Sequence, residues 1–302
     1  MSGSLPGVAA GVLGAAAQVI KAIGVFASRA LVADTPDSAA TGGNARGSNA
    51  VDLQTIRGAA TQVASGINSG VLSGNSNTAS ATGAVVPGGT SNTASGNNSF
   101  AGGTFCTASA SLAFAYGSSI AATANFAVAI GANNVADGVG AWARGQSAVT
   151  RARIGADAFA SGAFSTAGDA QVATQVIRGS TTDAATGVRL TSDGGAAAAN
   201  NSITLANNST YAFTGTLVAQ VSATSSKSWA INGLIRRGAN AAATALVGVP
   251  TATSTFGDAG LATIAVAITA DATNGAIAFT VNGVAATNIK YVAAIQTTEV
   301  VG

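Results

Sequence analysis

The hydrophobic pattern of this chain is dominated by a short apolar run that recurs with a constant period. Five pentapeptides (VVPGG, SFAGG, AFAYG, AVAIG and AWARG) close at Gly89, Gly103, Gly117, Gly131 and Gly145. Within several of these runs small and larger residues alternate, which is typical of a strand with one buried face. A period of 14 is too short for a pair of helices and fits one coil of a β-solenoid, with two short strands and two turns.

Two columns of side chains keep the same register through these repeats. The larger members, expected on the outside of the coils, are Phe100, Phe114, Val128 and Trp142. The small members, expected on the opposite face, are Ala101, Ala115, Ala129 and Ala143. The repeating glycine supplies a turn with positive φ, and the Asn, Ser and Thr residues between runs suit the other corner. Six coils at about 4.8 Å each predict a rod section of roughly 30 Å.

The repeat is interrupted near its end. AFASG, which ends at Gly162, follows Gly145 later than the constant period would place it. The delay indicates a three-residue insertion around 151–153.

Residues 169–302 have a different pattern, with longer apolar runs between turn signals. We expect nine strands, at 172–177, 188–191, 202–206, 211–222, 228–235, 244–247, 262–270, 276–281 and 289–301. The Asn274-Gly275 turn predicts a hairpin. In that hairpin three residues of one strand face three of the other: Ile264, Val266 and Ile268 against Ile277, Phe279 and Val281. Many strands separated by turns favour an antiparallel β-sandwich.

The beginning of the chain is apolar and rich in alanine and glycine. Alanine favours helix, so we predict a short apolar helical anchor over residues 1–33 that is buried in an assembly. The uncharged run 5–20 is shorter than the ~20 residues that span a bilayer, and the basic residues that open a secretory signal are missing. The expected organisation is therefore an attachment segment at 1–33, a connector at 34–70, a β-roll shaft at 71–168 and a C-terminal knob at 169–302.

The composition excludes several kinds of site. The chain has no histidine and one cysteine, so a zinc site of His and Cys ligands, a Ser-His-Asp triad and a disulfide framework cannot form within one chain. Charged residues make up 8% and none lies between Arg57 and Asp137, so there is no basic cluster for nucleic acid. We therefore predict a protein that is not an enzyme, with no catalytic, cofactor-binding or metal-binding residue, no cofactor and no nucleic-acid partner.

One enzymatic alternative is a spike that cleaves surface polysaccharide. Glycosidases need two carboxylates several ångströms apart. Asp137, Asp157 and Asp169 lie on the repeat or at its end, and Glu299 is the sole glutamate. Turn aspartates in solvent are the favoured interpretation of the three.

Another alternative is an ice-binding solenoid, which needs regular outward columns of threonine. Thr90, Thr104 and Thr107 do not keep the register of the repeat, and this argues against it.

Three arginines gather where the repeat breaks. Arg144, Arg151 and Arg153 can bind an anion or an aspartate of a neighbouring chain, such as Asp157. Cys106 is expected to be a small buried or edge residue, because no electropositive neighbour in sequence would activate its thiol. Trp229, on a predicted strand, is assigned to the core.

The repeats resemble the head repeats of trimeric bacterial adhesins, in which three chains form a left-handed β-roll side by side. The stretches that carry the resemblance are SNTASGNNSFAGG, ANFAVAIGANNVADG and AWARG. Similar repeats occur in tail fibres and spikes of bacteriophages. The segment NARGSNAVDLQTIRGAATQVASG and the stretches NSITLANNSTYAFTGTLVAQV and YVAAIQTTEVVG also resemble phage tail proteins, and the resemblance spans residues 44–302.

This resemblance implies a structural virion protein: a homotrimeric phage tail fibre or spike, assembled in the host cytoplasm. It implies attachment to tail or baseplate proteins through residues 1–70. The C-terminal part would bind a host surface receptor, a polysaccharide or an outer-membrane component. The alternative is a bacterial trimeric surface adhesin without its membrane anchor. The lack of a sustained heptad pattern for a coiled-coil stalk favours the phage protein.

Overall fold

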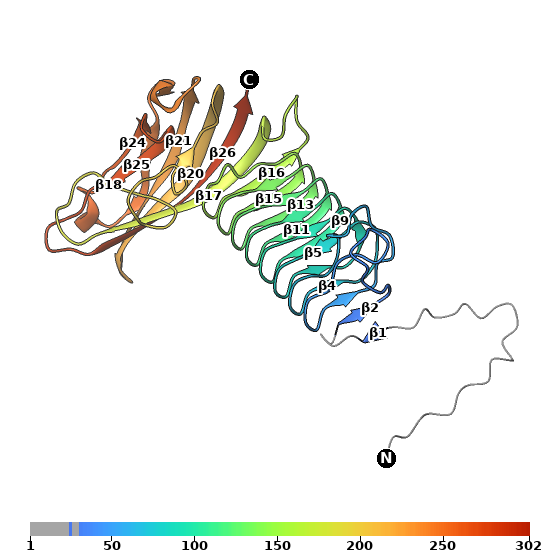
Figure 1. Ribbon diagram of the computed structural model, residues 1–302. Coiled ribbons are helices and arrows are strands. Elements are labelled where there is room, and N and C mark those ends of the chain that lie inside the picture. The colour runs from blue at the N-terminus through green and yellow to red at the C-terminus, as the bar shows by residue number, and fades with distance from the viewer. Residues whose placement is uncertain (1–23, 26–29) are drawn as a thin grey trace, which may run out of the picture.

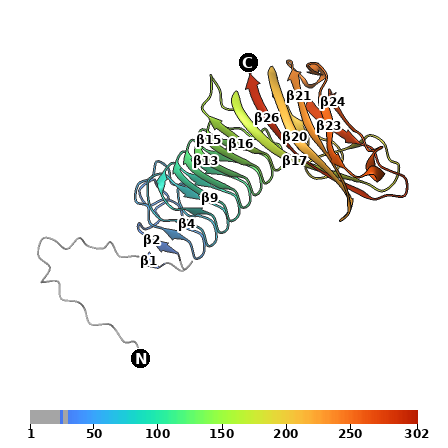
Figure 2. The same cartoon turned by 180° about the vertical axis from the view of Figure 1, so that it is seen from behind.

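The computed structural model describes residues 24–25 and 30–302, and its regular structure is almost entirely β: 48% strand and 2% helix. A β-solenoid of about seven turns leads into a group of antiparallel strands at one end, while the first described strands lie at the other end (Figure 1). The view from behind shows the same elongated arrangement (Figure 2). The prediction of a mostly β protein built on a repeat is confirmed.

The solenoid has two stacks of parallel strands. The first stack contains β2 (Leu31–Val32), β3 (Val51–Asp52), β4 (Gly70–Val71), β6 (Val85–Val86), β7 (Gly89–Thr90), β9 (Phe100–Thr104), β11 (Phe114–Ser118), β13 (Val128–Ala132), β15 (Trp142–Gln146) and β16 (Asp157–Ser161). The second contains β5 (Thr78–Ala79), β8 (Thr93–Ala94), β10 (Thr107–Ala108), β12 (Ala121–Ala122) and β14 (Val135–Ala136). The first stack is flanked by antiparallel neighbours, β1 (Gly24–Val25) beside β2 and β17 (Ala170–Thr181) beside β16.

The predicted register of the repeat is confirmed. Phe100, Phe114, Val128 and Trp142 are successive partners in the first stack, and so are the alanines that follow each of them. The alanines are at most 1% exposed and lie inside the coils. The buried cluster of the solenoid consists of alanines apart from Val71, Val86, Cys106 and Ile120. Such small side chains let the two stacks approach closely, so the core is thin.

The stack begins before the repeat that the sequence reveals. Segment 34–70, expected as a connector, contributes β3 and the start of β4, which continue the parallel pairing of β2 toward β6. Val51 pairs with Gly70, and this step along the chain is longer than the period of the later coils. The longer step hides these two strands from a search for a constant period.

The interruption near Arg151 is smaller than its spacing indicates. Trp142 pairs with Asp157 and Gly145 with Ala160, so this step exceeds that of the three preceding coils by one residue, where an excess of three was expected. Arg151 and Ala152 both have positive φ, 58° and 55°, and absorb the extra residue at the corner. The prediction was wrong because Gly162 is not the counterpart of Gly145.

The repeating glycine is required for two reasons. Gly117 has φ of +141°, a conformation that side chains rarely adopt. A Cβ atom there would also overlap the carbonyl oxygen of Gly131 in the next coil, and the same relation links Gly103 to Gly117 and Gly131 to Gly145. The glycine column therefore permits the coil spacing itself.

One interior column of the solenoid is polar and forms a ladder of hydrogen bonds. The side-chain amide of Asn92 donates to the carbonyl oxygens of Gly88 (3.1 Å) and Gly103 (2.8 Å), and Asn77 and Asn134 make equivalent pairs of bonds. The side-chain oxygen of Asn92 accepts from the backbone N–H of Cys106 at 3.0 Å. These bonds satisfy backbone groups at the corner that a coil of alanine would leave unpaired.

The C-terminal region contains two antiparallel sheets. In the larger, β17 pairs with β26 (Ile289–Val301), β26 with β20 (Ser209–Ser222) and β20 with β21 (Ser225–Arg237), which is followed at the edge by β22 (Thr244–Leu246) and β23 (Thr251–Gly257). In the smaller, β25 (Ala276–Val281) pairs with β18 (Val188–Arg189), β19 (Ile203–Thr204) and β24 (Val266–Asp271). Two 3₁₀ turns, Ala241–Ala243 and Ala259–Leu261, connect strands.

One hydrophobic cluster draws on both sheets of this region. Phe213 of the larger sheet meets Phe279 of the smaller edge to face, with ring centroids 6.0 Å apart. The predicted hairpin is confirmed, since Val266 pairs with Val281 and Ile268 with Phe279. Ile264 was wrongly included, because it precedes β24 and Ala270 is the partner of Ile277. The nine expected segments all contain strands, and β23 is an additional one. The sandwich itself stays a prediction.

Most of the apolar segment 1–33 lies outside the described residues, and with it the predicted helical anchor. Its last described parts are strands β1 and β2. Within residues 24–25 and 30–302, no helix has the length and hydropathy needed to cross a membrane.

Candidate functional site

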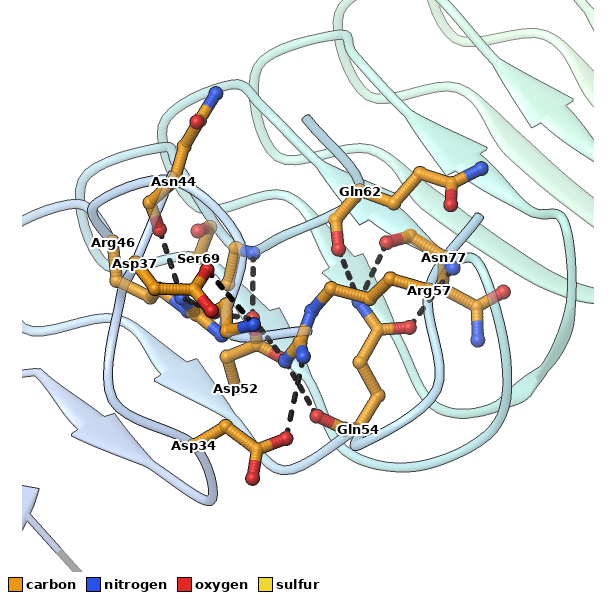
Figure 3. Close-up of polar contacts among 12 residues, drawn as sticks. Asp34, Asp37, Asn44, Arg46, Asp52, Gln54, Arg57, Gln62, Ser69 and Asn77 are labelled. Atoms are coloured by element: carbon orange, nitrogen blue, oxygen red, sulfur yellow. Dashed lines mark hydrogen bonds and ion pairs between the residues drawn. The ribbon is translucent and has the colours of Figure 1, made fainter. Parts of the chain in front are cut away.

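The first candidate is a buried charged cluster at the start of the solenoid, drawn in Figure 3. Arg46 Nε lies 2.8 Å from Asp52 Oδ2, and Arg57 Nη2 lies 3.5 Å from the same oxygen. Arg57 also approaches Asp34 at 3.4 Å. Burial lowers the pKa of the Arg46 guanidinium, while the charge of Asp52 acts in the opposite direction.

This cluster is closed to ligands. The side chains of Arg46, Asp52 and Arg57 are at most 1% exposed. Gln54 extends the network by donating to Gln62 O (2.7 Å) and Asn77 O (2.8 Å), which joins the cluster to the asparagine ladder (Figure 3). The arrangement seals the first coils of the alanine core and ties them to the repeat.

A second buried cluster lies where the solenoid meets the C-terminal region. Glu299 Oε1 is 2.8 Å from Arg153 Nη2, and its Oε2 is 3.3 Å from Arg151 Nε. Gln171 and Thr297 donate to the same carboxylate at 2.7 and 2.8 Å. Burial raises the pKa of Glu299, but the two arginine charges and the hydrogen bonds outweigh it, and the pKa lies below its ordinary value of 4.5.

The arginines therefore have partners within the chain. Arg151 and Arg153 bind Glu299, which the sequence did not single out as their partner. Arg144 binds Asp157 through two hydrogen bonds of 2.9 and 3.2 Å, so the aspartate expected from a neighbouring chain comes from the same one. This last pair is about half exposed, while the Glu299 cluster is buried.

Asp137 and Asp169, which were considered for polysaccharide cleavage, accept hydrogen bonds from nearby turn residues. Asp137 accepts from the Thr150 hydroxyl (2.8 Å) and from the Ala152 N–H (2.6 Å). Asp169 accepts hydrogen bonds from the backbone N–H groups of residues 164–166. These bonds hold the pKa of its carboxyl below the ordinary value, and the bond from Thr166 has the largest effect. Asp169 is only 3% exposed, so the expectation of a solvated turn was wrong for it. Among the residues that the structure describes, no three of His, Cys, Asp and Glu gather as a metal site.

Cys106 and Trp229 are buried, as expected. The thiol of Cys106 occupies the place of an asparagine in the ladder and contacts Gly117 O at 3.3 Å. Trp229 is 3% exposed in the C-terminal core, with the Lys227 ammonium 5.1 Å from its ring centroid.

The outer surfaces of the two strand stacks differ in chemistry. The outward side chains of β9, β11, β13, β15 and β16 form what we call the apolar face: Phe100, Phe114, Tyr116, Val128, Ile130, Trp142 and Phe159. Tyr116 and Trp142 are about half exposed, and the rings of Phe100 and Phe114 stack at 4.8 Å. Sequence reasoning placed the larger column outside but did not treat it as a binding surface.

The outer surface of the second stack carries hydroxyl groups. Thr78 pairs with Thr93 and Thr93 with Thr107, each followed two positions later by serine. Thr90 pairs with Thr104 in the first stack. The expectation that threonines lack register was therefore wrong, because Thr104 and Thr107 belong to different strands of one coil. The column of Thr107 ends at Ala121, so it covers three coils.

A groove in the C-terminal region offers a separate surface with both polar and apolar lining residues. It has a volume of 430 Å³ and lies at the ends of β17, β20 and β26. Thr181, Gln220, Ser222, Asn288 and Lys290 are among its lining residues.

Comparison of the chain with family models, with curated proteins and with solved structures gave no match. The geometry of the chain itself therefore carries the functional argument.

Proposed function

We propose that this protein is a structural component of a virion, a homotrimeric phage tail fibre or spike. In this proposal the N-terminal part, residues 1–70, attaches to the tail or baseplate. The solenoid is the shaft, a left-handed roll of three chains, and the C-terminal region is the knob that binds a polysaccharide or outer-membrane component of the host.

The observation that carries the proposal is a parallel repeat that runs directly into an antiparallel region at one end (Figure 1). Such an arrangement holds one end of the molecule at a distance from the other. The buried charged side chains pair with one another in two internal clusters, which suits a scaffold better than a reaction site. The repeats resemble those of phage fibres in sequence.

The host-binding role of the C-terminal region rests on its position and on this groove. The groove contains amide, hydroxyl and ammonium groups, the donors and acceptors that bind sugar hydroxyls. Three copies of a weak site raise the apparent affinity by a factor of roughly 10²–10⁴.

Light scattering on the purified protein, with and without residues 1–33, tests the oligomeric part of the proposal. We expect a mass close to three times 28.7 kDa for the full chain, and a trimer for the truncated form as well. A monomer would contradict the fibre, and a trimer lost on truncation would assign assembly to the N-terminal segment.

Labelling with an antibody against residues 169–302 tests location. We expect label at the tail tips of phage particles from the strain that carries the gene. Label on the bacterial surface without particles would support the adhesin alternative.

A further inference from the structure

The apolar face of the solenoid is larger than a surface that a single chain usually leaves in water. Tyr116, Ile130, Trp142 and Phe159 are 42–51% exposed. The same sheet continues without a break into the C-terminal region, because Phe159 pairs with Val172 of β17. There the strands of the larger sheet carry four further exposed valines: Val176, Val218, Val292 and Val300.

Two residues at the corner that leads into this face are apolar at positions with positive φ. Leu112 and Phe126 have φ of +58° and +61° and are 49% and 57% exposed. The equivalent positions in other coils are Asn98, Gly140 and Gly155, residue types that adopt positive φ at low strain. Leucine and phenylalanine strain the backbone here and leave about half of their surface exposed in the single chain. They stand two positions before Phe114 and Val128 of the apolar face.

The exposed area has the size of a stable interface. An aromatic side chain offers about 150–250 Å² in all, so half exposure gives roughly 100 Å² each. The six solenoid residues and the four valines together present on the order of 800 Å² per chain, about what one partner buries in a standard interface. Patches on monomers are usually about 300–600 Å².

Charge on this face also suits a copy of the same chain. Arg144 and Asp157, which lie between the exposed rings, neutralise each other in their ion pair. The Arg144 guanidinium lies 5.3 Å from the Phe159 ring centroid and covers part of it. The solenoid part of this face is therefore neutral and meets an identical surface without repulsion. The C-terminal part also carries the exposed Arg178, which pairs with Val292.

We infer that the apolar face, with the corner residues Leu112 and Phe126, is the surface through which copies of this chain associate side by side. The inference rests on the proposed homotrimeric fibre and adds the surface that the copies share. The hydroxyl-bearing surface of the second stack then remains in solvent.

Matched variants test this assignment by light scattering and sedimentation. The double variant Leu112→Asn with Phe126→Asn gives these two corners the residue type that Asn98 has at the equivalent corner of its coil. Asparagine adopts positive φ with less strain, so the fold is kept. Tyr116→Lys with Ile130→Lys charges the apolar face, and Ser95→Lys with Ser109→Lys charges the exposed serines of the opposite surface as a control. We expect the first two pairs to raise the dissociation constant at least tenfold and the control to leave it within twofold.

The outcomes separate this inference from the proposed function. Melting is followed by circular dichroism at a protein concentration low enough to dissociate both the wild type and the Leu112→Asn, Phe126→Asn double variant. Under these conditions the double variant must melt at or above the temperature of the wild type. Suppose that the wild type is oligomeric and that either no variant dissociates it or only the control pair does. The apolar face is then excluded as the interface, while the proposed fibre is not contradicted. If the wild type is monomeric, both fail.

Discussion

The solenoid and the C-terminal region of this chain are held together in different ways, although one sheet runs through both. The solenoid core is alanine with few larger residues, whereas the C-terminal core contains phenylalanine, tyrosine, tryptophan, leucine and isoleucine. An alanine buries little apolar area, so backbone hydrogen bonds and close stacking must stabilise the coils. The C-terminal region buries large side chains between its strands and depends on their volume.

The comparison teaches where each region is vulnerable. In the solenoid the sensitive positions are those without a side chain, because coil spacing leaves no room for one. In the C-terminal region the sensitive positions are the largest side chains. Where the two regions meet, the buried cluster of Glu299 with Arg151 and Arg153 joins them by charge.

The largest expected effect is that of Gly117→Ala. The added methyl group would overlap the carbonyl oxygen of Gly131 and occupy a positive φ. We expect a loss of more than about 4 kcal/mol in the free energy of unfolding, measured by urea denaturation. Gly155→Ala is the control, since φ there is +64° but no atom lies within 4 Å, and about 1 kcal/mol of strain is expected. Equal losses in the two variants would contradict the role of coil spacing.

Phe279→Ala tests whether the C-terminal core depends on the volume of its large side chains. This residue is 1% exposed and packs edge to face on Phe213. Its truncation should cost about 3–5 kcal/mol, because a cavity remains. Phe256→Ala, at a side chain that is 80% exposed, should change stability by less than about 0.5 kcal/mol. A small loss in Phe279→Ala would show that this core is not held by packing.

Glu299→Gln tests the charged link between the regions. The variant leaves Arg153 buried without a counter-charge and should lose about 3 kcal/mol. Asp157→Asn, which removes the exposed partner of Arg144, should lose less than about 1 kcal/mol. Calorimetry of both variants distinguishes them.

The same carboxyl predicts a pH dependence. The pKa of Glu299 is lowered in the folded protein, so its stabilisation is complete above the ordinary value of 4.5. It is lost as pH falls below 4.5 through the folded pKa. Glu299→Gln should therefore lose less stability than the wild type on acidification in this range. An identical acid profile for both proteins would contradict the lowered pKa.

The smallest expected effect is a gain. Cys106→Asn would extend the ladder between Asn92 and Asn134, with its amide placed to donate to Gly102 O and Gly117 O as Asn92 donates to its counterparts. We expect about 1 kcal/mol of added stability in thermal melts. Cys106→Ala, which removes the thiol contact, should be no more stable than the wild type. If Asn and Ala are equivalent here, the ladder contributes nothing at this coil.

Local chemistry explains what could be predicted for each region. The glycine, alanine and outer columns repeat because each coil meets the next through the same contacts, and the register follows directly from their spacing. The strands of the C-terminal region were predictable where apolar runs end in turn residues, as in Ile289–Val301. β23 was missed because Thr251–Gly257 is an exposed edge strand with no buried apolar alternation.

The candidate surfaces show the limit of the sequence. The outward column was predictable, yet its continuation into Val172 depends on the antiparallel pairing of β17 with β16. Strain at Leu112 and Phe126 is a backbone property that no residue count reveals.

The sequence by itself determined the coil, because a short constant period with glycine and alanine at fixed positions has one physical use, the stacking of short strands. Only the tertiary structure decided which charges meet. Glu299 and Arg153 are separated by 146 positions along the chain, and Asp34 and Arg57 by 23. Such pairs form where the path of the whole chain brings them out of water together, and this path is absent from any local pattern.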